Sequence, residues 1–214
     1  MPDALERSWE VLLIGGVSGG GKTTAARELS RSLAIPWLGV DDLRLAFQWS
    51  RVSLPKPEQT EALYFFLDTP DVWALPPERL RDGLIAVGEL MAPAIDIVVG
   101  NHLHNAGPLI LEGDGILPAI VEWPEMRAGL EAGRVRVLFI DEPDAERLLA
   151  NYRQRKRGPW DRPDAELRTE ARAKALFNAR IVHEAGERGL PTVPSRPFDA
   201  LVERIAGTAS ARPG

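Results

Sequence analysis

Apolar and polar positions alternate along this chain with two periods, and the order of the two patterns predicts an α/β protein. Short apolar runs bounded by turn residues, which are typical of buried parallel strands, lie at 11–15, 35–40, 109–111, 135–140 and 191–193. Apolar residues at helical spacing predict helices at 22–33, 77–100, 143–157, 165–188 and 197–206. Strands that alternate with helices in this way indicate a parallel sheet covered by helices on both faces.

A glycine-rich turn joins the first predicted strand to the first predicted helix. Residues 16–23 read Gly-Val-Ser-Gly-Gly-Gly-Lys-Thr, which matches the phosphate-binding P-loop pattern G-x-x-x-x-G-K-[ST]. Glycines let the backbone turn its N–H groups toward phosphate oxygens, and the following helix adds the partial positive charge of its N-terminus. Lys22 is expected to bind the β- and γ-phosphates and Thr23 to bind Mg²⁺. The predicted nucleotide-binding residues of this loop are Gly16, Val17, Ser18, Gly19, Gly20, Gly21, Lys22, Thr23 and Thr24.

Acidic residues follow the second and third predicted strands. Ligands of an open parallel sheet collect beyond the carboxyl ends of its strands, so these residues are expected near the P-loop. We predict that Asp41 accepts the proton of an acceptor hydroxyl and helps to hold Mg²⁺. The alternative is that Asp41 or Asp42 only caps a helix that starts near Leu43. Glu112 follows the run Leu-Ile-Leu and is predicted, with Thr23 and Asp41, to bind the metal.

Three residues near these strand ends are predicted to bind the acceptor. Arg44 would face an anionic acceptor with its planar guanidinium, although a solvated helix arginine remains the alternative. Glu112 is included because it lies at the same strand end. Asp114 lies two residues further on and could reach the acceptor, or it could be a turn aspartate within Glu-Gly-Asp-Gly.

A basic cluster at 153–157 predicts a lid, which we place at about 150–164. Arg153 and Arg157 are four residues apart and would share one helix face, where they could stabilise charge on a transferred phosphoryl group. We expect Arg153 to be catalytic and Arg157 to bind nucleotide; the alternative is that cations simply favour a helix C-terminus. Arg196, after the last strand, is predicted to border the adenine, unless it belongs to a plain connecting loop.

Residues at about 45–77 are rich in proline and aromatic side chains, and we interpret them as a partly helical cap within a single domain that spans 1–214. The aromatic residues at 64–73 are more typical of cap packing than of a stacking platform. His102 and His104 form an H-x-H pair, but without a third ligand of clear spacing a polar loop is the better interpretation.

Composition narrows the choice of partners. The chain of 214 residues carries a formal net charge of −5 and no cysteine, which disfavours nucleic acid as a partner and excludes thiolate metal sites. The first ten residues are charged, and we expect neither a signal peptide nor a membrane-spanning segment. A cytoplasmic location is the simplest expectation, and the oligomeric state, monomer or homodimer, stays open.

These motifs together resemble the small P-loop kinases of the adenylate kinase-like group. The likeness is greatest to archaeal-type 2-phosphoglycerate kinases and to relatives of chloramphenicol phosphotransferase and zeta toxin. It rests on residues 16–24, on 39–44, on 111–113 with Pro118, on 147–157, and on 183–185 and 189–191. The resemblance implies a three-layer P-loop NTPase fold, a five-stranded parallel sheet of order 2-3-1-4-5, ATP with Mg²⁺, and phosphorylation of a hydroxyl on a small molecule. At Gly115 the chain departs from the phosphoglycerate kinases, which tend to carry a histidine there.

The motifs favour an ATP-dependent kinase over two alternatives. An ATPase or nucleotide switch that needs no acceptor is one, although the chain has neither an Asn-Lys-x-Asp guanine motif nor a Leu-Ser-Gly-Gly transporter signature. A kinase of antibiotics or nucleotide sugars, of the toxin-like type, is the other. Its chemistry would be the same, and only its acceptor would differ.

Overall fold

A five-stranded parallel sheet forms the centre of the protein, in the computed structural model, which describes residues 8–154 and 162–211. Its strands are β1 (Val11–Gly16), β2 (Trp37–Gly39), β3 (Leu109–Glu112), β4 (Val135–Asp141) and β5 (Thr192–Pro194). Their order is β2-β3-β1-β4-β5, and every neighbouring pair is parallel. This order confirms the predicted fold class, a P-loop α/β sandwich.

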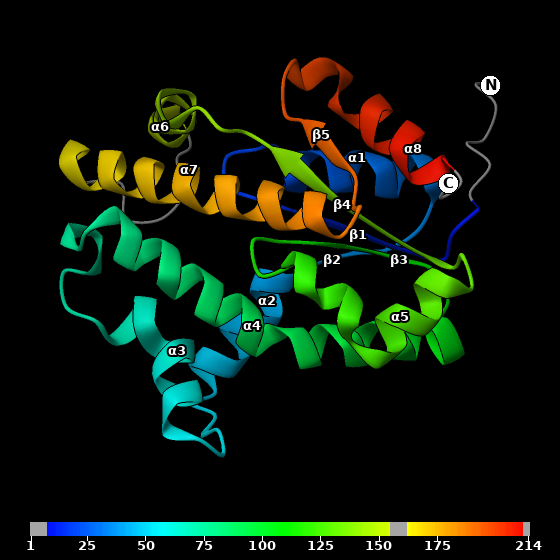
Figure 1. Ribbon diagram of the computed structural model, residues 1–214, viewed down its shortest axis with the longest axis horizontal. Helices are drawn as coiled ribbons and strands as arrows, with labels where there is room; N and C mark the ends of the chain where they lie inside the picture. The colour runs from blue at the N-terminus through cyan, green and yellow to red at the C-terminus, as the bar shows by residue number, and fades with distance from the viewer. Residues whose placement is uncertain (1–7, 155–161, 212–214) are drawn as a thin grey trace.

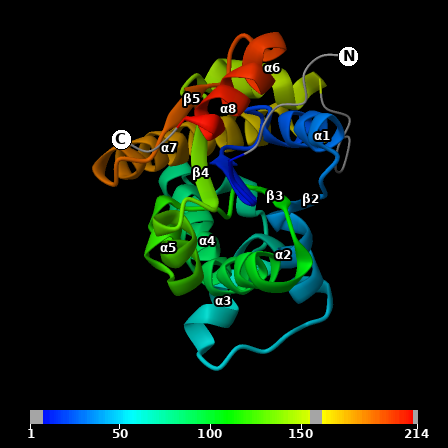
Figure 2. The ribbon, with the colours of Figure 1, turned by 90° about the vertical axis from the view of Figure 1, so that its right-hand side faces the viewer.

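Helices cover both faces of the sheet (Figure 1). They are α1 (Lys22–Leu33), α2 (Val40–Trp49), α3 (Pro57–Asp68), α4 (Pro77–Asn101), α5 (Pro124–Glu131), α6 (Ala145–Gln154), α7 (Asp164–Glu187) and α8 (Leu201–Ser210). Shorter helical turns are η1 (Val72–Ala74), η2 (His102–Ala106), η3 (Pro118–Glu122) and η4 (Phe198–Ala200). Figure 2 shows α1 and α8 on one side of the strands and α4 and α5 on the other.

The central strand β1 explains why the apolar runs are continuous. Val11 and Leu13 belong to the core under α4, α5 and α7, whereas Leu12 and Ile14 belong to the core under α1 and α8. All four side chains are fully buried. A strand covered on both faces needs apolar residues at every position, which is the pattern seen in the sequence.

The second strand is shorter than predicted. It ends at Gly39, and α2 begins at once with Val40, so Asp41 and Asp42 lie in the first turn of a helix instead of ending a strand. Acidic side chains are favourable there because they face the positive end of the helix dipole. Among the described residues, no backbone N–H of α2 donates a hydrogen bond to either carboxylate.

The long helix α4 has nearly its predicted extent, and Pro93 lies inside it. Together with η2 it forms the segment Pro77–Ala106, which is long and apolar enough to cross a membrane by length and composition alone. Half of its most apolar window is buried inside the protein, as in the core helix of a globular domain. The helix α5 has no counterpart among the predicted elements.

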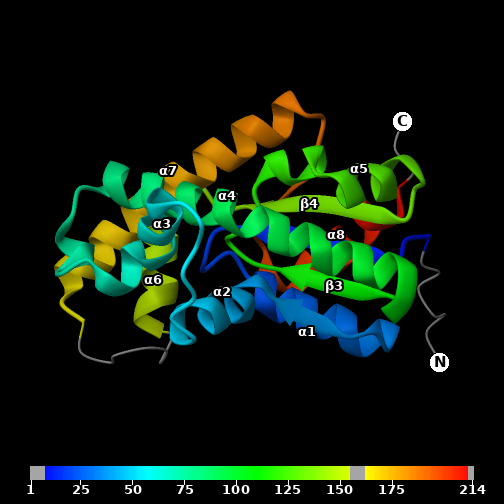
Figure 3. The ribbon, with the colours of Figure 1, turned by 90° about the horizontal axis from the view of Figure 1, so that it is seen from below.

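The elements of the predicted cap and lid lie beyond one end of the sheet. Figures 1 and 3 show α3, α6 and the start of α7 at this end. The cap consists of the last residues of α2 together with α3 and η1. The predicted lid includes residues 155–161, which lie outside the described residues, and Arg157 is among them.

Candidate active site

The loop after β1 has a backbone that requires glycine at several positions. Gly16, Gly19 and Gly21 have φ angles of 123°, 96° and 96°, in the region that side chains rarely adopt. A Cβ atom on Gly16 would lie 2.5 Å from the backbone oxygen of Ile140 in β4. The loop therefore packs closely against the sheet, and Lys22 opens α1 directly after it.

Lys22 is buried and points back into the loop. Its Nζ atom donates to the backbone oxygen of Val17 at 2.9 Å and forms an ion pair with Oδ1 of Asp114 at 2.6 Å. The side chain is only 5% exposed. Asp114, which sequence reasoning placed among the acceptor-binding residues, thus contacts the P-loop lysine itself.

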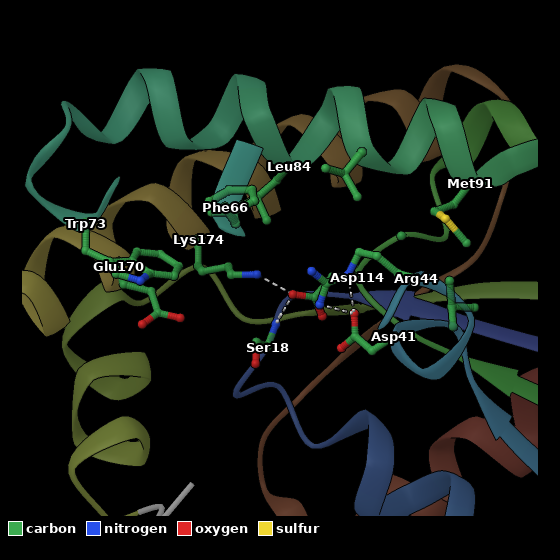
Figure 4. Close-up of a pocket in the computed structure, with 13 residues that line it drawn as sticks. Ser18, Asp41, Arg44, Phe66, Trp73, Leu84, Met91, Asp114, Glu170 and Lys174 are labelled. Carbon is green, nitrogen blue, oxygen red and sulfur yellow. Dashed lines mark hydrogen bonds and ion pairs between the residues drawn. The ribbon is translucent and has the colours of Figure 1, made fainter. Parts of the chain in front are cut away.

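Two further donors bind the same carboxylate. The backbone N–H of Ser18 donates to Oδ2 of Asp114 at 3.2 Å, and Nζ of Lys174 in α7 donates to the same oxygen. Burial alone would raise the pKa of Asp114, but Lys174 and Lys22 outweigh it and hold that pKa well below its usual range. Asp114 is therefore ionised at neutral pH. Figure 4 shows Lys174 reaching toward this carboxylate.

Two of the three predicted metal ligands, Thr23 and Glu112, are in contact. The Thr23 hydroxyl donates to Oε1 of Glu112 at 2.9 Å. Burial raises the pKa of Glu112, the nearby Asp114 and Asp41 carboxylates raise it further, and Lys22 and the Thr23 hydroxyl oppose the rise. The Thr23 hydroxyl and the buried Glu112 carboxylate are hard oxygen donors of the kind that Mg²⁺ accepts in combination with phosphate oxygens. The residues present therefore fit the predicted cation.

Asp41 and Arg44 form an ion pair on α2, and both line a cavity of about 220 Å³. Nη2 of Arg44 lies 3.1 Å from Oδ1 of Asp41, and the Asp41 side chain is 58% exposed. The cavity has a polar end at the P-loop and an apolar wall from α4, α3 and η1 (Figure 4). Its lining residues are Ser18, Val40, Asp41, Arg44, Phe66, Trp73, Leu84, Val87, Met91, Asp114, Gly115, Glu170 and Lys174.

The helix α6 holds the P-loop from the side of the predicted lid. Nδ2 of Asn151 donates to the backbone oxygen of Gly19 at 2.9 Å, and the Tyr152 hydroxyl donates to the backbone oxygen of Ser18 at 2.9 Å. The next residue, Arg153, is instead engaged by Asp164 at the start of α7, with Nε 2.9 Å from Oδ1. In this arrangement Arg153 belongs to an ion pair between α6 and α7.

Arg196, which is predicted to border the adenine, is connected to the P-loop through Asn151. Its Nη2 atom donates to Oδ1 of Asn151 at 3.2 Å, its Nε to the buried Glu142 at 3.3 Å, and its guanidinium stacks 4.0 Å from the ring centroid of Phe198. A second cavity of about 140 Å³ lies beside the loop. It is lined by Gly19, Gly21, Thr24, Ala25, Glu28, Phe198, Leu201 and Val202.

The histidine pair is accounted for by local hydrogen bonds. His102 Nδ1 lies 2.7 Å from the backbone oxygen of Gly107, and His104 Nε2 lies 3.0 Å from Oε2 of Glu125. Within residues 8–154 and 162–211 no group of three or more His, Cys, Asp or Glu side chains is arranged to hold a metal ion. Of the aromatic residues at 64–73, Phe66 and Trp73 line the first cavity and stack on each other with centroids 5.5 Å apart.

Sequence reasoning missed Lys174 and the contacts of Asn151 and Tyr152. Lys174 lies on the buried side of α7, between the buried Ala171 and Phe177. A lysine among buried apolar helix positions indicates a buried ion pair, because a buried charge needs a partner. The sequence does not show which residue is that partner.

No protein-family model and no curated protein sequence matches this chain. Solved structures similar in overall shape include a gluconokinase from Sinorhizobium meliloti 1021 (TM-score 0.49, 14% identity, 96% of this chain and 94% of that one). They also include shikimate kinases from Aquifex aeolicus vf5 (TM-score 0.44, 18%, 92% and 95%) and from Acinetobacter baumannii in complex with shikimate (TM-score 0.46, 16%, 95% and 96%). At these values the likenesses do not identify an activity for this chain.

Proposed function

We propose that this protein is an ATP-dependent phosphotransferase that moves the γ-phosphoryl group of Mg-ATP to a hydroxyl of a small molecule. The observation that carries the proposal is that the P-loop and the cavity meet. Ser18 of the P-loop lines the cavity of about 220 Å³. Asp114, which binds Lys22 and the Ser18 N–H, also lines it. A phosphate bound on the loop would therefore face a space suited to a small acceptor.

The residues where the P-loop meets the cavity support separate roles in phosphate binding and in acceptor activation. Lys22 and the loop N–H groups would bind the phosphates, and they would stabilise the charge on the transferred group. Asp41, which lines the cavity, would orient the acceptor hydroxyl and take its proton. The hydroxyl oxygen then forms the new bond to phosphorus while the bond from phosphorus to the bridging oxygen breaks, and its electron pair leaves with ADP.

Thr23 and Glu112 are the residues that would hold Mg²⁺, and Asp41 is proposed to help through a bound water. The cation, when bound, would neutralise charge on the β- and γ-phosphates. Glu112 is suited to this role because its carboxylate is already buried and oriented by the Thr23 hydroxyl. Arg196 is proposed to border the base, through its stacking position beside Phe198.

The acceptor is proposed to be a small metabolite with a hydroxyl that reaches the polar end of the cavity. Arg44 could bind an anionic group of a 2-phosphoglycerate-like acceptor if that group replaces Asp41 as its ion-pair partner. The apolar wall, which includes Leu84 and Met91, would instead contact the carbon skeleton of an antibiotic-like or other amphiphilic alcohol. Both classes therefore belong in the acceptor panel.

The experiment that tests the proposal compares the wild-type protein with Lys22→Ala. Titration calorimetry with Mg-ATP should show binding to the wild type and a loss of ~100-fold or more in affinity for Lys22→Ala, because a charge-assisted phosphate contact and its buried counter-charge are disturbed together. ADP production should also depend on an acceptor. Equal Mg-ATP affinity of the two proteins would contradict the P-loop assignment, and acceptor-independent ADP release would favour an ATPase.

A further inference from the structure

Two buried ammonium groups converge on one carboxylate at the P-loop. Lys22 comes from α1 and Lys174 from the middle of α7, and both side chains are 5% exposed. They bind opposite oxygens of Asp114, which also accepts the N–H of Ser18. A carboxylate held by a P-loop N–H and the P-loop lysine takes the same donors that a phosphate on this loop would take.

The charges of this cluster are not those of a simple structural ion pair. One carboxylate between two buried ammonium groups leaves positive charge on the pair, which a more highly charged anion in the same place would offset more fully. Glu112 lies near enough to Lys22 to offset part of its charge, but it accepts the Thr23 hydroxyl. Asp41 pairs with Arg44, and Glu170 pairs with Arg162. A terminal phosphate group carries more negative charge than Asp114 and fits this requirement.

We propose that Lys174 is a second phosphate-binding cation of the site, and that Asp114 competes with the terminal phosphate for Lys22, Lys174 and the Ser18 N–H. Binding of a triphosphate then moves the two lysines from the carboxylate to the phosphate. Asp114 stays at the polar end of the acceptor cavity, which it lines. The proposal rests on the proposed function, because it assigns two residues of the same site.

The position of Lys174 indicates a role beyond holding α7 against the sheet. α7 packs along both α4 and α6, and Lys174 itself lines the acceptor cavity with Glu170, one turn earlier. Lys174 meets the P-loop through Asp114, and Lys174, Asp114 and Ser18 all line this cavity, so a phosphoryl group passing from the loop to an acceptor would pass near the lysine. Such a cation would stabilise the charge of the group during transfer.

The test compares the affinities of Mg-AMP-PNP, which has a terminal γ-phosphate, and of Mg-ADP, which lacks it. Titration calorimetry with Lys174→Met should show a ~10- to 100-fold loss of affinity for Mg-AMP-PNP, as expected for loss of one charge-assisted contact, and a much smaller loss for Mg-ADP. Lys174→Arg, which keeps the positive charge, should retain part of the wild-type difference in affinity between Mg-AMP-PNP and Mg-ADP. Asp114→Asn, which removes the competing charge at nearly constant shape, should bind Mg-AMP-PNP ~10-fold more tightly than the wild type does.

Lys56→Met is the matched control, because Lys56 is an exposed lysine before α3 and does not line the cavity. Its affinities for both nucleotides should equal those of the wild type. If Lys174→Met does not fold, Lys174→Arg and Asp114→Asn still decide the question. Equal effects of each substitution on Mg-AMP-PNP and Mg-ADP would overturn the proposal and leave Lys174 and Asp114 as a structural pair. A folded wild type that binds neither nucleotide would instead refute the proposed function.

Discussion

Asp41→Asn separates a catalytic carboxylate from one that only stabilises its helix. The substitution removes the charge and proton affinity of Asp41 but keeps its shape. Asp41 pairs with Arg44 three residues later on α2, and the two side chains are 58% and 24% exposed. The pair lies largely in solvent, where water and salt screen it.

The two interpretations predict very different magnitudes. An exposed ion pair contributes less than about 1 kcal/mol, so Asp41→Asn should lower the melting temperature by no more than about 4 °C in a chain of this size. If Asp41 takes the hydroxyl proton, turnover should fall by ~10²–10⁴, which corresponds to about 3–5 kcal/mol of lost transition-state stabilisation. Mg-ATP affinity should stay nearly constant.

The assay is steady-state ADP production with the best acceptor, combined with thermal unfolding and Mg-ATP titration of the same samples. Asp42→Asn is the matched control, since Asp42 is an exposed carboxylate in the same helical turn and does not line the cavity. It should keep wild-type turnover. Turnover of Asp41→Asn within a factor of two of the wild type would refute the catalytic role and leave Asp114 as the carboxylate nearest the phosphate.

Two other predictions follow from the same site. Because the pKa of folded Glu112 is raised above its ordinary 4.5, the folded protein binds this proton more tightly than the unfolded chain, and stability falls as pH rises through that window. In EDTA, Glu112→Gln should therefore have a higher melting temperature than the wild type at pH 8, and the difference should be much smaller at pH 4.5. Its turnover with Mg-ATP should fall. A melting temperature below that of the wild type at pH 8 would contradict the raised pKa. Trp73→Ala should raise the acceptor KM about tenfold at unchanged Mg-ATP affinity, because Trp73 lines the cavity wall. Trp49 is exposed, and Trp49→Ala should leave the acceptor KM unchanged. Equal acceptor KM values for Trp73→Ala and the wild type would show that Trp73 does not contact the acceptor.

The parts of the fold that were predictable are those fixed by local sequence. The P-loop could be recognised because its glycines, Lys22 and Thr23 are consecutive and join a strand to a helix. The strands buried on both faces could be recognised from their continuous apolar runs. The sheet order did not follow from these patterns; it came from the resemblance to small P-loop kinases, and the structure confirms it.

Contacts between distant segments could not be predicted. Lys174 and Asp114 are 60 positions apart, and nothing in either sequence neighbourhood indicates that they meet. Asp114 was expected at the acceptor, and the structure places it at the cavity and on the P-loop lysine together. Arg153 was expected to be catalytic, but its ion pair with Asp164 depends on how α6 and α7 pack, which periodicity does not reveal.

The most direct test of the central claim is mass spectrometry of acceptors incubated with Mg-ATP and the wild-type protein. The panel contains 2-phosphoglycerate, gluconate, shikimate, sugars, nucleosides, nucleotide sugars, aminoglycosides and chloramphenicol, with Lys22→Ala as the inactive control. The account predicts that one class gains the mass of a single phosphoryl group, with one ADP formed for each product molecule. ADP released by the wild type without any phosphorylated acceptor, or the same product formed by Lys22→Ala, would contradict it.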